Sequence, residues 1–251
     1  MIELHHVTAG YGRQTVLQDL SLSLEPGCLT SIIGVNGCGK STTLKAILGM
    51  IPLQGGDIIL DGESIRRMSR NNIARKIAYL SQGRNTPDMT VEQIVLHGRF
   101  PHLSYPRRYT AGDRAIAQAT MEQMGIADLA RQPLSTLSGG MRQNTYIAMA
   151  LAQGTDYVLL DEPTTYLDIA HQLELMKTLR CLAEAGKGIV TVTHDIQMAF
   201  TFSDRIILLG GGTVLGNDVP DEICRQNILE ETMGVSLCHT ETGYAYRYLQ
   251  V

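Results

Sequence analysis

The sequence has no apolar run that approaches the roughly 20 residues needed to span a membrane. Its first residues, Met1-Ile2-Glu3-Leu4, lack the basic region and apolar run of a signal peptide. It has no long basic run and a net charge of −4, which argues against nucleic acid as a partner. No repeat or low-complexity linker divides the 251 residues, so we expect a single domain over residues 1–251.

Cysteine is scarce, and its spacing shows neither pairs nor a metal site. The five cysteines contain no C-x-x-C pair; they are Cys28, Cys38, Cys181, Cys224 and Cys238. An odd, scattered set fits a reducing cytosol. Cys28, beside an apolar stretch, is expected to be a small buried residue, whereas Cys38 lies inside a glycine-rich loop.

That loop, Gly34-Val35-Asn36-Gly37-Cys38-Gly39-Lys40-Ser41, fits the pattern G-x-x-x-x-G-K-[ST] of a phosphate-binding loop. Leu29–Ile33 before it is typical of a buried strand, and residues 42–50 after it are typical of a helix. Such a turn presents backbone N–H groups and a helix N-terminus to an anion. We predict that Lys40 reaches the β- and γ-phosphates of ATP and that the Ser41 hydroxyl binds Mg²⁺.

ATP binding is therefore assigned to one continuous set of residues: Gly34, Asn36, Gly37, Cys38, Gly39, Lys40, Ser41 and Thr42. The Cys38 thiol has two alternative positions. It either faces the phosphates, where alkylation would block binding, or lies beneath the loop and is unreactive.

Strand-like and helix-like segments alternate along the chain, which predicts an α/β fold with a mainly parallel core sheet. Strands are expected at residues 55–62, 77–80, 157–160 and 188–193, and a hairpin at residues 205–215. Residues 2–33 suggest strands with turns at Gly10, Gly12 and Pro26-Gly27. The stretch of about 88–153 is mainly helical and is interpreted as a subdomain inserted into the core.

Capping patterns mark the starts of helices within that stretch. Thr90 and Gln93 resemble a capping box. The next helix starts at either Thr110 or Asp113, and Ser138 opens a third.

Polar residues follow several of the predicted strands. Asp161 ends the strand at residues 157–160, which is how a P-loop nucleotidase places an aspartate near Mg²⁺. Glu162 comes next and is well placed to polarise a water for attack on the γ-phosphate. Gln82 follows the strand at residues 77–80 and is expected near the metal or that water.

Ser138-Gly139-Gly140 forms a second candidate anion cradle, since a serine cap and two glycines begin a helix there. Two such cradles cannot both bind the same phosphate within one chain. The second is therefore expected to bind a nucleotide held by another copy of the chain.

With these motifs in this order, the sequence resembles the ATP-binding subunits of ABC transporters over nearly its whole length. Ser138-Gly139-Gly140 is similar to their signature motif, and Thr165-Tyr166-Leu167-Asp168 to their D-loop. The resemblance implies a P-loop NTPase core with an antiparallel β subdomain and an inserted helical subdomain. It also implies roles for further residues: adenine stacking by Tyr11, metal or water contact by Gln82, nucleotide contact by Asp168, and γ-phosphate contact by His194.

The sequence departs from the family pattern at Met141 and Asn144, where Gln and Arg are usual. Neither position carries the serine or glycine donors. We expect ATP contact to survive and some contacts at the dimer interface to differ.

The resemblance implies an ATP hydrolase that uses ATP and Mg²⁺ and dimerises head to tail. It implies integral-membrane permease subunits as partners, a substrate-binding protein as an indirect partner, and a place at the cytoplasmic face of the membrane. The surface that contacts the permease is expected around residues 83–105.

Two stretches, residues 97–102 and 164–169, resemble the corresponding stretches in ATP-binding subunits of importers for iron-siderophore complexes, haem or cobalamin. Two alternatives stay open: a molybdate or tungstate importer, and a non-transport ABC ATPase. A coiled-coil repair or chromosome ATPase does not fit, because only about one hundred residues without sustained heptads separate the P-loop from Ser138.

Overall fold

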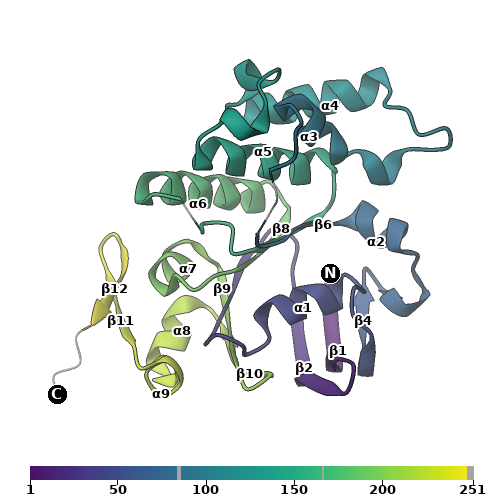
Figure 1. Ribbon diagram of the computed structural model, residues 1–251. Helices are drawn as coiled ribbons and strands as arrows, with labels where there is room; N and C mark the ends of the chain where they lie inside the picture. The colour runs from purple at the N-terminus through teal and green to yellow at the C-terminus, as the bar shows by residue number, and fades with distance from the viewer. Residues whose placement is uncertain (84–85, 166, 248–251) are drawn as a thin grey trace.

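A six-stranded sheet runs through the centre of the computed structural model, which describes residues 1–83, 86–165 and 167–247 (Figure 1). The strand order is β10-β9-β3-β8-β7-β6. The strands are β3 (Leu29–Ile33), β6 (Ile77–Leu80), β7 (Tyr157–Asp161), β8 (Gly188–Val192), β9 (Arg205–Gly210) and β10 (Thr213–Asp218). All neighbours pair in parallel except β9 and β10, which form the predicted closing hairpin.

A second sheet is antiparallel and has the order β2-β1-β4-β5. Its strands are β1 (Ile2–Tyr11), β2 (Gln14–Leu24), β4 (Leu53–Leu60) and β5 (Glu63–Ser64). Helix α1 (Lys40–Ile47) shares a hydrophobic cluster with this sheet and with one face of the central sheet. The predicted combination of a parallel core and antiparallel β strands is thus confirmed.

Helices α3 (Val91–His97), α4 (Ala111–Gln123) and α5 (Gly139–Ala152) form a block between β6 and β7 in the sequence. They pack with α6 (Ile169–Glu184) in a second cluster, on the opposite face of the central sheet from α1. The alternation along β7 shows this, since Leu159 belongs to the first cluster and Val158 and Leu160 to the second. The assignment of this block as a separate subdomain stays a prediction.

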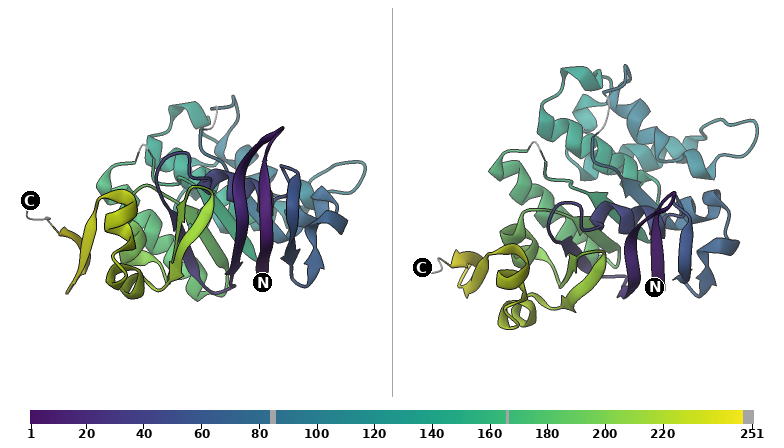
Figure 2. Two further views of the ribbon diagram at one scale, coloured as in Figure 1. Left: turned by 90° about the horizontal axis from the view of Figure 1, so that it is seen from below. Right: turned by 60° about the horizontal axis from the view of Figure 1, so that its bottom comes forward.

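The remaining helices lie toward the two ends of the molecule. Helix α2 (Arg70–Lys76) lies with β4 at one end, and the β11 (Ser236–Thr240) and β12 (Gly243–Arg247) hairpin lies at the other (Figure 2). The hairpin packs on α7 (Ile196–Phe202) through an edge-on contact between Phe200 and Tyr244. Helices α8 (Pro220–Arg225) and α9 (Ile228–Met233) fill the space beside it.

Local sequence signals account for most helix starts. The Thr90–Gln93 capping box is present. Thr110, not Asp113, caps α4, because its hydroxyl accepts from the Asp113 N–H and the Asp113 carboxylate accepts from the Thr110 N–H. Ser138 caps α5 as predicted.

Three sequence expectations need correction. Gly10 is not a turn residue, because it lies within β1 and pairs with Thr15 of β2. Helix α1 begins at Lys40, two residues earlier than expected, so Lys40 and Ser41 belong to its first turn. Cys28 is partly exposed rather than buried, because it precedes β3 instead of lying within it.

Within the described ranges, none of the helices combines the length and the apolar character that a membrane span requires.

Candidate functional site

The glycine-rich loop between β3 and α1 wraps around the Lys40 ammonium group. The Lys40 Nζ atom donates hydrogen bonds to the carbonyls of Gly34 at 2.8 Å and Val35 at 3.1 Å. Gly34 has a φ of +148°, and a Cβ there would lie 2.2 Å from the Leu209 carbonyl oxygen, so only glycine fits. A phosphate is a stronger acceptor than a carbonyl and would compete for the same ammonium group.

The other predicted loop residues lie along the same turn. Asn36 and Gly37 are exposed at its tip, Gly39 is the N-cap of α1, and Thr42 lies in the first turn of the helix. The Cys38 side chain is only 4% exposed and belongs to the cluster beneath the loop. Of the two alternatives for this thiol, the structure has the buried one.

Ser41 and Asp161 meet at the C-terminal end of the parallel strands. The Ser41 hydroxyl donates to Asp161 Oδ1 at 2.9 Å, and the Tyr79 hydroxyl donates to Asp161 Oδ2 at 3.4 Å. Burial raises the pKa of the Asp161 carboxyl. A hydroxyl and a carboxylate are donor types that suit Mg²⁺, which usually takes one or two protein ligands together with phosphates and waters. The described residues contain no cluster of three or more His, Cys, Asp or Glu side chains that could hold a metal ion.

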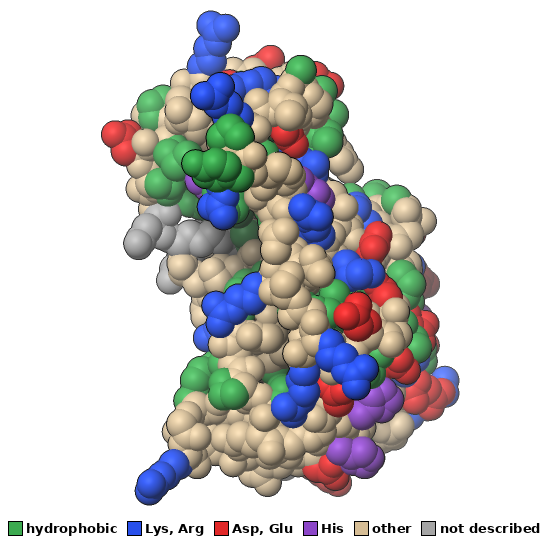
Figure 3. Space-filling model, turned by 90° about the vertical axis from the view of Figure 1, so that its right-hand side faces the viewer, with side chains coloured by type: hydrophobic (Ala, Val, Ile, Leu, Met, Phe, Trp, Pro, Cys, Tyr) green, Lys and Arg blue, Asp and Glu red, His purple; other side chains and the backbone are tan. Residues whose placement is uncertain are grey.

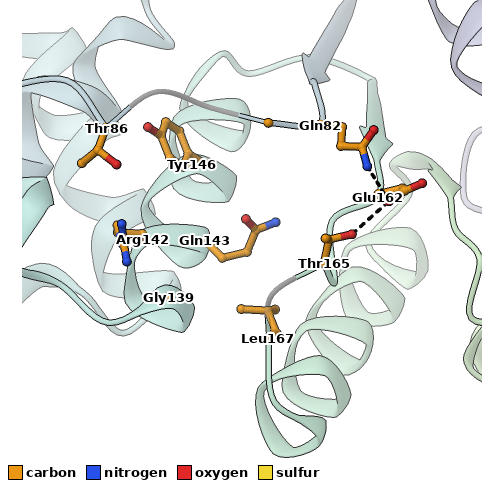
Figure 4. Close-up of a pocket in the computed structure, with 10 residues that line it drawn as sticks. Gln82, Thr86, Gly139, Arg142, Gln143, Tyr146, Glu162, Thr165 and Leu167 are labelled. Carbon is orange, nitrogen blue, oxygen red and sulfur yellow. Dashed lines mark hydrogen bonds between the residues drawn. The ribbon is translucent and has the colours of Figure 1, made fainter.

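Glu162 is the most constrained side chain of the site. Its φ of +50° is a conformation that non-glycine residues rarely adopt and that the surroundings must enforce. One carboxylate oxygen, Oε2, accepts from Gln82 Nε2 at 2.6 Å and from the Thr165 hydroxyl at 3.1 Å (Figure 4). His194 Nδ1 lies 3.6 Å from the same oxygen. The structure therefore brings three predicted residues together, Gln82, Glu162 and His194.

Two residues of this site were not assigned a role from the sequence. From the sequence, Thr165 was assigned only to the D-loop. It lies three residues after Glu162, and its backbone N–H donates to the Glu162 carbonyl, as in a tight turn. Tyr79 lies within β6 and approaches Asp161 only through the pairing of β6 with β7, which no local pattern reveals. Gln82 binds Glu162 in this structure, and its assignment as a Mg²⁺ ligand stays a prediction.

Tyr11 is the last residue of β1, which lies between β2 and β4 in the antiparallel sheet. Its side chain is 47% exposed, and the Lys45 ammonium lies 5.9 Å from the ring centroid. An exposed ring in this position has a face open for stacking. Its role in adenine binding stays a prediction.

The second anion cradle lies at the N-terminus of α5. Ser138 Oγ accepts from the Met141 N–H at 3.3 Å. Gly140 packs so closely on the ring of His171 that a Cβ would lie 2.6 Å from it. The His171 ring in turn contacts the Asp168 carboxylate at 2.8 Å. The hydrogen bond from the His171 backbone N–H, and after it the ring contact, lower the pKa of Asp168. Ser138-Gly139-Gly140 and Asp168 thus form one packed unit. Tyr166 lies outside the described residues.

A cavity of about 450 Å³ separates α5 from the Glu162 side of the site. Arg142, Gln143 and Tyr146 of α5 line one wall, and Glu162 and Thr165 line the other (Figure 4). In the described part of the chain, no hydrogen bond joins residues 138–140 to the loop at residues 34–41. Since α1 and α5 pack on opposite faces of the central sheet, one chain does not bring its two cradles together.

Comparison of the chain with known proteins identifies the protein family to which it belongs. A family model described as ABC transporter matches residues 17–165, and the chain belongs to that family as an ATP-binding subunit with ATPase activity. The iron(3+)-hydroxamate import ATP-binding protein FhuC of Bacillus subtilis (strain 168) is 43% identical over 228 residues, covering 90% of this chain and 85% of the relative. The ferric enterobactin transport ATP-binding protein FepC of Escherichia coli (strain K12) is 40% identical, covering 91% and 85%. The hemin import ATP-binding protein HmuV of Pseudomonas fluorescens (strain Pf0-1) is 36% identical, covering 97% and 98%.

Solved structures agree on the fold. An inward-facing putative metal-chelate type ABC transporter superposes with a TM-score of 0.84 at 24% identity, covering 98% of this chain and 97% of the other. The dimeric bacterial ABC transporter cassette MJ0796 superposes with a TM-score of 0.76 at 29% identity, covering 88% and 99%. The resemblance to ABC transporter subunits found in the sequence is confirmed.

Proposed function

We propose that this chain hydrolyses ATP to power the import of a metal chelate through separate membrane subunits. The observation that carries the catalytic part is the juxtaposition of the Ser41–Asp161 pair with a Glu162 carboxylate held by Gln82 and Thr165. The observation that carries the import part is the similarity to relatives named for iron-siderophore and hemin import.

Each residue has a distinct task in hydrolysis. Lys40 exchanges its two carbonyl partners for phosphate oxygens and stabilises their charge. Ser41 and Asp161 would hold Mg²⁺, which would neutralise phosphate charge. Glu162 accepts a proton from the attacking water, and His194, on the exposed side of Glu162, contacts the γ-phosphate.

Two copies of the chain would complete the two sites. Because Ser138 and the P-loop of one chain are separated, each ATP would lie between the loop of one copy and the Ser138 cradle of its partner in a head-to-tail dimer. ATP binding would close this dimer and hydrolysis would reopen it.

A groove between the central sheet and the helical block fits the permease. It has a volume of about 700 Å³, and its apolar lining includes Met50, Ile73, Tyr79, Phe100 and Met149. Met50 is 56% exposed and Phe100 is 44% exposed, so both present apolar surface to a partner. From the predicted stretch 83–105 the groove takes His97, Phe100 and Pro101, and its other lining residues come mainly from α2, from β6 and from the turn after α1. Residues 84 and 85 lie outside the described residues.

The cargo is tested by growth. We expect the subunit to act at the cytoplasmic face of the membrane. Deletion of this chain should impair growth when an iron-siderophore complex or haem is the sole source of iron, or when external cobalamin is the sole source of that cofactor. Wild-type chain should restore growth and the Glu162→Gln variant should not. A defect confined to molybdate or tungstate uptake would move the assignment to those importers. A chain whose loss affects no uptake at all would be a non-transport ABC ATPase.

A further inference from the structure

The Ser138 cradle belongs to the helical block, so its position depends on the side chains that join α5 to the rest of the chain. Figure 3 shows the surface recessed on one side between this upper block and the sheets below. The cavity of about 450 Å³ separates much of α5 from the Glu162 side of the site. A displacement of about 1 Å at a catalytic group can cost about 10²-fold in rate. A contact that fixes the first turn of α5 would therefore matter for hydrolysis.

The His171 ring makes such a contact with the cradle. A Cβ on Gly140 would lie 2.6 Å from His171 Cδ2 and 3.0 Å from Nε2, closer than a side chain tolerates. The ring and the helix backbone meet this closely because Gly140 has no side chain. Gly140 is buried, although the His171 side chain is 46% exposed. One edge of the imidazole thus covers the backbone of the cradle.

The Asp168 carboxylate sets the orientation of that ring. Its Oδ1 atom accepts from the His171 backbone N–H at 2.9 Å, and His171 Nδ1 lies 2.8 Å from both carboxylate oxygens. With a proton on Nδ1, the ring donates to the carboxylate and turns its opposite edge, Cδ2 and Nε2, toward Gly140. Beside it, Gln172 Nε2 donates to the Leu167 carbonyl at 3.0 Å and holds the backbone that precedes Asp168.

Capping of α6 does not explain the imidazole. Asp168 is the N-cap of α6, and the backbone N–H of His171 alone satisfies this cap. The residue at this third helical position commonly is Glu or Gln, whose side chain reaches back to the backbone N–H of the cap residue. The His171 ring instead bonds to the Asp168 side chain and packs on another helix. Its position therefore serves the contact between α6 and α5.

We propose that His171 is a positioning residue for ATP hydrolysis, which fixes the Ser138 cradle by holding the backbone of Gly140 against a ring oriented by Asp168. This inference rests on the proposed head-to-tail dimer and adds a residue that does not itself contact the nucleotide. The cradle of one chain would serve the ATP on the Lys40 loop of the other. His171 would therefore act on the site that contains the loop of the partner copy.

The test uses a heterodimer with a single intact site, purified through a different affinity tag on each chain. One chain carries Lys40→Ala and supplies the cradle, and the other carries Ser138→Arg and supplies the loop. His171→Ala in the Lys40→Ala chain should lower kcat at least about tenfold. The same change in the Ser138→Arg chain, whose cradle is already lost, should lower kcat less than about twofold. A merely structural role would not produce this asymmetry.

Two further variants in the Lys40→Ala chain separate the ring from the cap and from the helix. His171→Asn keeps a donor near the position of Nδ1 and removes the ring, so we expect a loss close to that of His171→Ala. Lys177→Ala is a matched exposed change on α6 and should behave like the starting heterodimer. Thermal unfolding should show that all variants are folded. Full activity of His171→Asn would mean that only the Asp168 contact matters, and would overturn the inference.

The remaining outcomes distinguish this inference from the dimer on which it rests. Equal losses from His171→Ala in either chain, or no loss in either chain, would overturn the role of His171 and leave the head-to-tail arrangement standing. A starting heterodimer without ATPase activity would reject the head-to-tail arrangement, and the inference with it.

Discussion

The Gln82 side-chain amide donates a hydrogen bond of 2.6 Å to the Glu162 carboxylate. Gln82 lies two residues beyond β6, and Tyr79 within that strand lines the docking groove. One short stretch of chain therefore joins the surface proposed for the permease to the carboxylate proposed to activate water. A shift of this stretch on docking would act on the Gln82–Glu162 contact first.

The hydroxyl of Thr165 should matter for hydrolysis and not for nucleotide affinity. Thr165→Val keeps the shape of the side chain and removes the hydrogen bond to Glu162. We expect kcat to fall about tenfold, which corresponds to about 1.4 kcal/mol, the scale of one hydrogen bond to a charged group. The dissociation constant of ATP should be unchanged. Thr165→Ser keeps the donor and should retain most of the activity; equal losses in both variants would contradict a role for the hydroxyl.

The separation of the two cradles predicts complementation between mutants. A chain with Ser138→Arg and a chain with Lys40→Ala should each be inactive alone. A mixed dimer would contain one site with an intact Lys40 loop and an intact Ser138 cradle, so mixtures should regain part of the ATPase activity. If heterodimers form and mixtures show only the sum of the separate activities, each site lies within a single chain.

The buried thiol of Cys38 should react slowly with iodoacetamide in the folded protein, because its side chain is only 4% exposed. Cys181 and Cys238 are exposed and serve as internal controls in the same sample. Mass spectrometry of digested protein after timed labelling measures all three rates. Labelling of Cys38 as fast as Cys181 would show that the thiol faces solvent.

The Arg99–Asp113 pair should make stability depend on pH. Both side chains are nearly buried, and hydrogen bonds from the Thr110 backbone and hydroxyl, with Arg99 beside them, lower the Asp113 pKa to about 2. A carboxyl whose pKa is lower in the folded protein stabilises the fold at pH values above its pKa in the unfolded chain. That contribution is lost as the pH falls through its pKa in the folded protein. Asp113→Asn should therefore lower the free energy of unfolding by about 1 to 2 kcal/mol at pH 7.

Urea unfolding at pH 7 and at pH 3 measures this difference. The gap between wild type and Asp113→Asn should narrow at pH 3, because part of the Asp113 contribution is then lost in the wild type. Asp128→Asn changes an exposed carboxylate of the same helical block and should have little effect at either pH. If the difference in unfolding free energy between wild type and Asp113→Asn is as large at pH 3 as at pH 7, the charge of the Asp113 carboxylate does not stabilise the fold.

Much of the site could be predicted because its residues follow strands or cap helices. Lys40 and Asp161 are fixed by a loop pattern and a strand end, and Ser138 and Thr90 by capping patterns. Each of these signals lies within a few neighbouring residues. Local backbone chemistry is enough to generate them.

Other features depend on which faces of the sheet pack together, and no local pattern contains that information. The Tyr79–Asp161 contact requires the pairing of β6 with β7, and the groove collects residues from Leu48 to Gln153. The burial of Cys38 likewise depends on the cluster beneath the loop, and the partial exposure of Cys28 on where β3 begins. These outcomes belong to long-range packing.

The most direct test of the account is single-turnover ATP hydrolysis by the Glu162→Gln variant. This change keeps the shape of the side chain and removes the carboxylate that would accept the proton of the attacking water. We predict near-normal ATP affinity, hydrolysis slower by roughly 10²-fold or more, and accumulation of an ATP-bound dimer. Glu174→Gln, an exposed change on α6, should behave like wild type. Near-normal hydrolysis by purified Glu162→Gln protein would contradict the account.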